Sequence, residues 1–183
     1  MHHLPVILFG AGGVGRSLLR QIVDNRSFHV LQFGLEIQVL AVCDSDGAVL
    51  EPSNGLDDEL LCEIIAHKRE GKRLADHRMG GPQADLTSIV DIAGRAGAVV
   101  VDCTASTATV PALLFALDRR YKIVLANKKP LTIDQEVYDR LTAAGGTAGD
   151  GSTAEPAPRV RHLGRARWET TVGAALPIIV TLN

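Results

Sequence analysis

Six residues near the start of the chain have the spacing of a dinucleotide-binding loop. The stretch GAGGVG satisfies the pattern G-x-G-x-x-G and lies between a short apolar run and a helical pattern. Glycines here let the backbone approach a pyrophosphate closely, and the unpaired amides at the helix start favour its negative charge. The alternative is an ordinary glycine-rich turn, but the strand–helix context favours a cofactor site. The candidate cofactor-binding residues of this loop are Gly10, Ala11, Gly12, Gly13, Val14 and Gly15.

An acidic residue, Asp44, closes the second apolar run of the sequence. Dinucleotide-binding folds place there the carboxylate that bonds the adenosine ribose, usually about 20 residues after the glycines. The spacing here is longer, and we expect an insertion over residues 26–36 to account for the difference. A carboxylate at this point favours NAD over the 2′-phosphate of NADP. The alternative is a solvated acid in a turn.

Polar residues also follow the third and fourth apolar runs. Thr104 comes directly after the valine-rich run 98–103, and Lys128 follows the run 122–126. Parallel strands bring their carboxyl ends to one edge of a sheet, so we expect Asp44, Thr104 and Lys128 to meet the glycine loop at one crevice. Lys128 could contact the nicotinamide side of the cofactor or the substrate; the alternative is a solvated loop with two adjacent lysines.

A thiol in the same region, Cys103, could act as a nucleophile, as in acylating dehydrogenases with a dinucleotide fold. The sequence shows no histidine paired with Cys103, and a cysteine in a valine-rich strand is usually a small apolar side chain. We therefore keep a covalent role for Cys103 only as an alternative.

One carboxylate stands alone in a mostly apolar segment near the end of the chain. This residue is Glu169. In an extended chain, carbonyl groups two residues apart point the same way. The carbonyls of Val172, Ala174 and Leu176 could therefore join the Glu169 carboxylate around a hard cation, which prefers oxygen ligands.

Strand and helix patterns alternate along the chain. Strands are expected at 5–9, 37–43, 98–103, 122–126 and 167–172, and helices at 14–24, 56–65, 85–95, 111–118, 134–144 and from 177 onward. This order predicts an α/β fold with right-handed crossovers, a Rossmann-type doubly wound parallel sheet. We expect residues 1–164 to form a dinucleotide-binding domain, with 145–164 as a flexible loop or linker. Residues 165–183 are expected to be the truncated start of a second domain.

Composition excludes several classes of partner. With 46% apolar residues and a net charge of −2, the chain can bury a core but offers a poor field for nucleic acid or an anionic membrane surface. Its apolar runs are shorter than the roughly 20 residues that a spanning helix needs. Three cysteines without metal spacing fit a reducing compartment. We expect a cytoplasmic protein, or a plastid one if a transit peptide has been removed.

Taken together, these segments resemble homoserine dehydrogenase, in particular its monofunctional, plant-like members. The resemblance covers nearly the whole chain and rests on GAGGVG, VCDSDG with LDDELL, VVVDCTAS, VLANKKPLT and RWETTVGAALPII. It implies reversible hydride transfer between L-homoserine and aspartate 4-semialdehyde, with NADP or NAD as cofactor. It also implies a place in the biosynthesis of threonine, methionine and isoleucine.

The resemblance assigns roles to individual positions. It places the cofactor loop on residues 10–15, the cofactor-side threonine on Thr104 and the lysine of the Ala-Asn-Lys motif on Lys128. Asp44 departs from the NADP preference common in the family, so the choice between NADP and NAD stays open. The family's monovalent cation site, usually sodium, corresponds to Glu169, Val172, Ala174 and Leu176.

No catalytic residue can be assigned within the chain by this resemblance. In the family, the acid/base lysine and the homoserine-binding acids lie beyond the position of Asn183, in a substrate domain that also forms the homodimer. We therefore expect the chain to bind cofactor and to turn over little or no homoserine alone. The alternatives are a non-catalytic dinucleotide-binding module and another oxidoreductase of this fold that uses Cys103.

Overall fold

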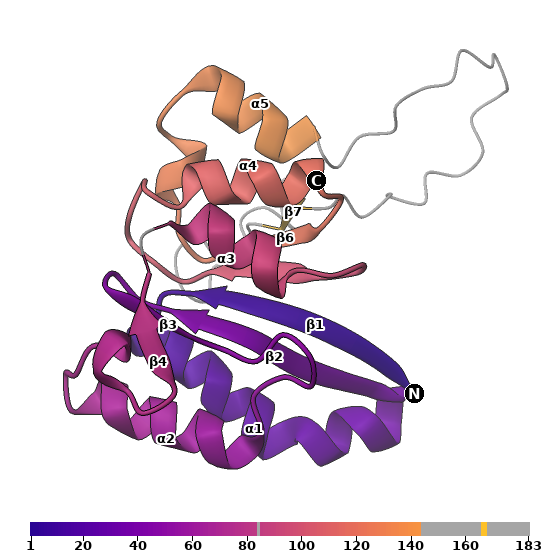
Figure 1. The fold of residues 1–183 in the computed structure, drawn as a ribbon. Coiled ribbons are helices and arrows are strands. Elements are labelled where there is room, and N and C mark those ends of the chain that lie inside the picture. The colour runs from indigo at the N-terminus through magenta and orange to yellow at the C-terminus, as the bar shows by residue number, and fades with distance from the viewer. Residues whose placement is uncertain (84, 144–165, 168–183) are drawn as a thin grey trace, which may run out of the picture.

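The computed structural model describes residues 1–83, 85–143 and 166–167 (Figure 1). The helices are α1 (Gly13–Phe33), α2 (Asp58–Arg69), α3 (Leu86–Ala93), α4 (Val110–Asp118) and α5 (Gln135–Ala143). The strands are β1 (His2–Phe9), β2 (Leu35–Cys43), β3 (Gly47–Leu50), β4 (Gly80–Pro82), β5 (Val99–Asp102), β6 (Lys122–Leu125) and β7 (Ala166–Arg167). Two short 3-10 turns, η1 (Leu74–Asp76) and η2 (Lys129–Leu131), lie in connections.

All these strands belong to one sheet in the order β4-β3-β2-β1-β5-β6-β7. Five neighbouring strands of this order pair in parallel, namely β2, β1, β5, β6 and β7. The strand order reverses at the boundary between β1 and β5. This arrangement confirms the predicted doubly wound fold. The sheet is mostly parallel, and β3 and β4 add an antiparallel edge beside β2 that the sequence did not indicate. Both are short and glycine-containing, so they lack the apolar alternation by which a strand is recognised.

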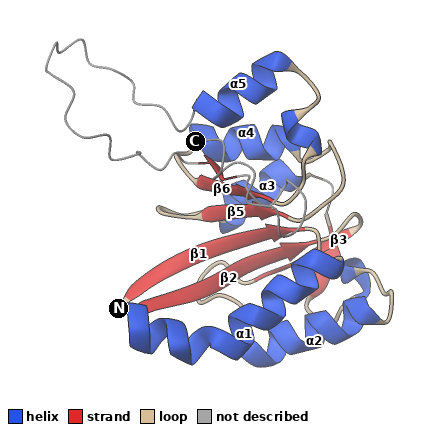
Figure 2. Ribbon diagram, turned by 180° about the vertical axis from the view of Figure 1, so that it is seen from behind, coloured by secondary structure: helices blue, strands red, loops and turns tan. Residues whose placement is uncertain are grey.

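Helices cover both faces of the sheet (Figures 1 and 2). Along β1, Val6 and Leu8 pack in one apolar cluster with residues of α1 and α2, such as Leu19. Ile7 and Phe9 face the other way, into a cluster with α3, α4 and α5. Burial on both faces explains why the central strands are continuous apolar runs rather than alternating ones.

Helix α1 is longer than expected. It continues to Phe33 and ends at Gly34, whose left-handed conformation (φ 60°) lets its N–H bond the Val30 carbonyl. Most of residues 26–36, the stretch expected to account for the longer spacing to Asp44, forms the last turns of α1. After Gly15 no glycine or proline occurs before Gly34, so no residue of these types ends the helix earlier.

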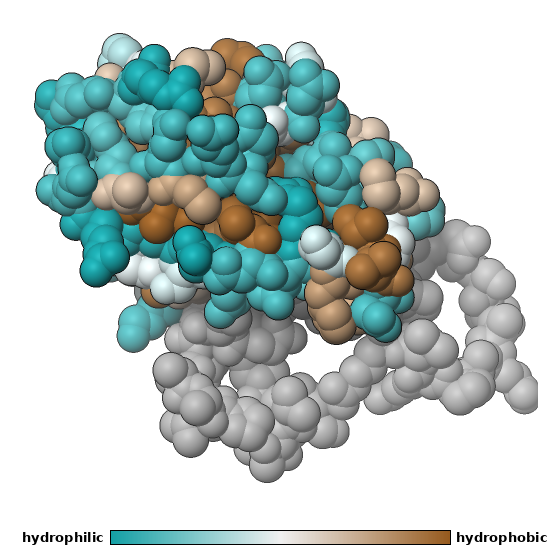
Figure 3. All heavy atoms as spheres, turned by 90° about the horizontal axis from the view of Figure 1, so that it is seen from below, coloured by the Kyte–Doolittle hydropathy of each residue, from teal (hydrophilic) through white to brown (hydrophobic). Residues whose placement is uncertain are grey.

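The outer surface of α1 and α2 is mostly hydrophilic, with scattered hydrophobic side chains (Figure 3). Three of these side chains lie at the end of α1, where Phe28, Leu31 and Phe33 are 53%, 80% and 66% exposed. Among the described helices, none is both long enough and apolar enough to cross a membrane.

Candidate functional site

A cavity of about 840 Å³ lies where the carboxyl ends of β1, β2 and β5 meet. This is the crevice in which doubly wound sheets bind their ligands. It brings together the glycine loop, Asp44 and Thr104, as expected. Its lining residues are Gly10, Ala11, Gly12, Val14, Asp44, Ser45, Lys68, Gln83, Asp85, Leu86, Cys103, Thr104, Ala105, Ser106, Ala108 and Thr109.

Two glycines of the loop are required by close packing. Gly10 has a φ of 89°, and a Cβ there would lie 2.8 Å from the carbonyl carbon of Cys103. A Cβ on Gly15 would lie 1.9 Å from the carbonyl oxygen of Gly10. By contrast, a Cβ on Gly12 would meet nothing within 4 Å, and Gly12 lines the cavity. Gly10 and Gly15 therefore allow the turn, and Gly12 leaves room for a ligand.

The start of α1 faces the cavity. Gly12 is the N-cap of α1 and has no side chain to bond the first amides, and the first helical hydrogen bond runs from the Arg16 N–H to the Gly12 carbonyl. The amides of Gly13, Val14 and Gly15 precede that bond and have no partner inside the helix. Free amides and the positive end of the helix dipole favour an anion such as a pyrophosphate.

The carboxylate of Asp44 is already saturated by protein donors. Its Oδ1 accepts from the N–H groups of Asp46 (2.9 Å) and Gly47 (2.8 Å), and its Oδ2 accepts from Lys68 Nζ (2.5 Å) and the Leu74 N–H (2.9 Å). Burial by itself raises the pKa of Asp44, but these hydrogen bonds, led by that from Lys68, hold the pKa below its usual value. Asp44 is therefore ionised and ties the β2–β3 turn to the segment before β4.

This geometry bears on how the adenosine ribose is recognised. A carboxylate has about four acceptor sites, and four protein donors use those of Asp44. Asp44 lines the cavity, but its role toward the ribose stays a prediction. Among the described residues that line the cavity, Lys68 is the one with a cationic side chain. The sequence did not indicate Lys68, because a lysine in the last turn of α2 looks like an ordinary helix end.

A buried polar pair joins the loops after β5 and β6. Asp102 at the end of β5 is fully buried, and Asn127 after β6 is 3% exposed. The Asn127 side-chain amide donates to Asp102 Oδ2 (3.1 Å) and to Thr104 Oγ1 (3.0 Å). This pair was missed from the sequence, although the buried strand end and the adjacent ANKKP stretch are the signals that could have indicated it.

The thiol of Cys103 lines the cavity but is not prepared for nucleophilic attack. Burial, and secondarily the charge of Asp102, raises the pKa of Cys103 to about 11. A nucleophilic cysteine needs the opposite shift, toward the thiolate. The site geometry therefore gives no support to covalent chemistry at Cys103.

Two other predicted elements of the site are not among the described residues that line the cavity. Lys128 is exposed at the start of η2 and is not among the described residues that line the cavity. The predicted cation ligands lie outside the described residues; these are Glu169, Val172, Ala174 and Leu176. Within the described ranges, no group of three or more His, Cys, Asp or Glu side chains is arranged to hold a metal ion.

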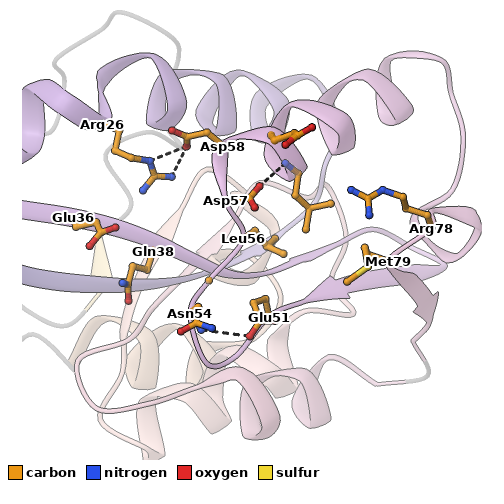
Figure 4. A pocket seen from close by; sticks show the side chains of 13 residues that line it. Arg26, Glu36, Gln38, Glu51, Asn54, Leu56, Asp57, Asp58, Arg78 and Met79 are labelled. Atoms are coloured by element: carbon orange, nitrogen blue, oxygen red, sulfur yellow. Dashed lines mark hydrogen bonds and ion pairs between the residues drawn. The ribbon is translucent and has the colours of Figure 1, made fainter.

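A second cavity of about 600 Å³ lies beside β2 and the start of α2 (Figure 4). Its charged groups are largely paired with each other or with backbone: Arg26 bonds Asp58 and the Ile37 carbonyl, and Asp57 caps α2 by accepting from the Leu60 N–H. Since these groups already have partners, this cavity is a weaker candidate site than the one at the strand ends.

The comparisons with known proteins agree with this geometry. Residues 10–151 match the family described as homoserine dehydrogenase, NAD binding domain. The chain is 25% identical over 181 residues to a bifunctional aspartokinase/homoserine dehydrogenase of Buchnera aphidicola, covering 98% of this chain and 19% of that protein. It is 26% identical over 189 residues to a chloroplastic bifunctional aspartokinase/homoserine dehydrogenase 2 of Arabidopsis thaliana, covering 98% of this chain and 17% of that one.

A solved structure has the same fold. A hyperthermophilic archaeal homoserine dehydrogenase in complex with NADPH superposes with a TM-score of 0.70 at 21% identity, covering 99% of this chain and 48% of that chain. The chain thus spans less than a fifth of the curated relatives and about half of the structural one. The family match covers most of the chain, including the glycine loop, Asp44 and Thr104. The chain belongs to the family of homoserine dehydrogenase NAD-binding domains.

Proposed function

We propose that the chain holds the nicotinamide cofactor for the interconversion of L-homoserine and aspartate 4-semialdehyde. The observation that carries this proposal is the open Gly12 position beside the unpaired amides of α1, at the head of the cavity. Family membership supports the reaction, and the fold supports the place of the cofactor. When bound, the nicotinamide accepts hydride from homoserine or donates it to the aldehyde.

The chain's own residues bind and orient the cofactor. The amides of residues 13–15 hold the pyrophosphate, because they are free and lie at the positive end of α1. A dinucleotide crosses the sheet where the strand order reverses, here between β1 and β5. The adenosine half therefore lies toward Asp44 and Lys68, and the nicotinamide half lies toward Thr104. We keep Lys128 as a contact of the substrate or nicotinamide side, from the family resemblance.

The cationic side chain of Lys68 in the cavity favours NADP as the cofactor. Lys68 lies at the adenosine side, where a 2′-phosphate would be, and its Nζ bonds Asp44 Oδ2 and the Lys72 carbonyl. A lysine offers three donors, so the third is left for a phosphate. Asp44 opposes a 2′-phosphate only weakly, because its carboxylate is paired with Lys68 and accepts hydrogen bonds from three backbone amides.

The reaction also needs a proton donor for the developing alkoxide. Near the nicotinamide side, the titratable side chain that lines the cavity in the described ranges is Cys103, with a pKa raised to about 11. We therefore propose that the acid/base comes from a substrate domain, in which residues 165–183 take part after a linker at 145–164. The resemblance supports a monovalent cation at Glu169 and a homodimer of the full-length enzyme.

The thiols bear on the proposed location. Cys43, Cys62 and Cys103 are free in the described part of the chain, which supports a reducing compartment, the cytoplasm or a plastid.

Titration of the purified chain with NADPH and NADH tests the cofactor site. We expect both to bind, and Gly12→Val should weaken binding about tenfold or more, because its side chain enters the cavity rather than the core. Stability should fall by only about 1 kcal/mol, the cost of replacing a favourable N-cap residue. Gly81→Val is the matched control, since a Cβ on Gly81 also meets nothing within 4 Å and Gly81 is not among the residues that line the cavity. Binding that is unaffected by Gly12→Val contradicts the proposed site.

A non-catalytic dinucleotide-binding module is the second candidate function. The observation that favours it is the lack, among the described cavity residues, of an acid/base near Thr104. Homoserine-dependent reduction of NADP separates the two candidates. Activity that appears when a substrate domain of this family is joined to the chain supports the enzyme, whereas activity absent from every such fusion supports the module.

A further inference from the structure

The loops after β5 and β6 are held together by a buried carboxylate that has no ion-pair partner among the described residues. Asp102 accepts three hydrogen bonds, all from neutral donors: the Thr104 N–H to Oδ1 (2.8 Å), and the Thr109 hydroxyl (2.7 Å) and the Asn127 amide (3.1 Å) to Oδ2. Its backbone carbonyl accepts from the N–H groups of Ala126 and Asn127. A buried carboxyl group of this kind depends on its hydrogen-bond donors, so the loss of one donor lowers stability.

The orientation of the Asn127 side chain follows from its neighbours. Its Nδ2 lies 3.1 Å from Asp102 Oδ2, 3.0 Å from Thr104 Oγ1 and 2.7 Å from the Ser106 carbonyl. Its Oδ1 accepts from the Lys129 N–H (3.1 Å). A flipped amide would place Oδ1 against a carboxylate and a carbonyl, so the donor face must point toward Thr104.

This orientation determines what the Thr104 hydroxyl can do. Its oxygen accepts from Asn127 Nδ2 (3.0 Å) and from the Ser106 N–H (3.3 Å). A hydroxyl has two acceptor lone pairs and one hydrogen. The two hydrogens of Asn127 Nδ2 serve three acceptors, so one hydrogen is shared between two of them. With donors facing both of its lone pairs, the Thr104 hydroxyl is left to act as a donor, and Thr104 lines the cavity.

We propose that Asn127 is a positioning residue that sets the Thr104 hydroxyl as a hydrogen-bond donor toward the carboxamide oxygen of the nicotinamide. This inference rests on the proposed function, because it takes the cofactor to lie with its nicotinamide half at the end of β5. A neutral donor at this point matches a carboxamide oxygen, the strongest neutral acceptor of the nicotinamide. The bond fixes the rotation of the ring, and so selects the ring face that is turned to the substrate.

Two ligands separate this role from a general loss of structure. NADPH carries the nicotinamide, whereas 2′-phospho-ADP-ribose has the same adenosine and pyrophosphate groups without it. The wild-type protein should bind NADPH more tightly. Loss of one neutral hydrogen bond corresponds to about a two- to tenfold change in affinity, so Asn127→Ala and Thr104→Val should each weaken NADPH by that factor and leave 2′-phospho-ADP-ribose unchanged. The double variant should be no weaker than Thr104→Val alone.

Asp57→Ala is the control for a general loss of stability, since it removes the side-chain cap of α2 and Asp57 is not among the residues that line this cavity. It should lower the melting temperature without changing the ratio of the two affinities. If Asn127→Ala weakens both ligands equally, or neither, the proposal is wrong. Should Asn127→Ala fail to fold, Thr104→Val against Thr104→Ser decides, because only the serine keeps the donor. If the wild-type protein binds neither ligand, the proposed function itself has failed.

Discussion

Replacement of Asp44 separates a structural role of this acid from a role in ribose binding. In Asp44→Ala, the backbone N–H groups of Gly47 and Leu74 lose their acceptor in a half-buried position, and that of exposed Asp46 turns to water. Each buried donor left without a partner costs about 1–3 kcal/mol. Lys68 also loses its ion pair. We expect the free energy of unfolding to fall by about 2–6 kcal/mol, mostly from two such donors, with a smaller contribution from Lys68.

The assay is urea unfolding of the protein without cofactor, followed by circular dichroism. The effect must appear in this state, because the donors to Asp44 all belong to the protein. Asp46→Ala is the control: Asp46 is exposed and its carboxylate accepts from the neighbouring Ser45 hydroxyl, so its loss should change stability by less than about 0.5 kcal/mol. Asp44→Asn should be intermediate, since it retains one acceptor oxygen.

The refuting result combines two measurements. If Asp44→Ala lowers stability by less than about 1 kcal/mol and weakens NADH binding tenfold or more, the carboxylate serves mainly the ribose. The hydrogen bonds to Asp44 would then contribute little to the stability of the cofactor-free protein. A large loss of stability with retained NADH affinity in the Asp44→Asn variant supports the structural role.

Three further outcomes follow from the geometry. Gly15→Ala should destabilise the protein by about 3 kcal/mol or more, measured by urea unfolding, because its Cβ would lie 1.9 Å from the Gly10 carbonyl oxygen; an unchanged midpoint would contradict this. Lys68→Met should weaken NADPH about ten- to a hundredfold more than NADH in fluorescence titrations, the range for a bond to a charged group; an equal loss would remove Lys68 from phosphate binding. Burial and the nearby charge of His67 lower the pKa of His77 below 6.5. The folded protein therefore binds fewer protons there than the unfolded chain, so stability should fall as the pH drops below about 6.5, and His77→Asn should flatten this slope.

Periodic, buried segments could be predicted from the sequence. The central strands and the glycine loop follow from apolar runs and from spacing, which depend on local sequence alone. Strands β3 and β4 could not be predicted, because the pairing of Gly47–Leu50 with β2, and of Gly80–Pro82 with Gly47–Leu50, is set by tertiary contacts.

The candidate site was predictable where residue type determines position. Gly10 and Gly15 were identified because only glycine fits where a backbone approaches so closely. Asp44 was placed at the crevice, but its four protein donors come partly from residues far along the chain, such as Leu74, and spacing cannot indicate these. Asn127 was missed for the same reason, since its amide bonds residues more than twenty positions away.

The antiparallel addition to the sheet has a consequence for how separate molecules meet. A parallel sheet that ended at β2 would expose a long row of unpaired amides, a template for aggregation through strand pairing. Here the outermost strand on that side, β4, is three residues long and ends in Pro82, which has no N–H to offer. Near the start of β2, the Arg26 side chain donates a hydrogen bond to the Ile37 carbonyl. Within the described part of the chain, these features leave few unpaired backbone groups along this edge of the sheet and so disfavour strand addition between molecules.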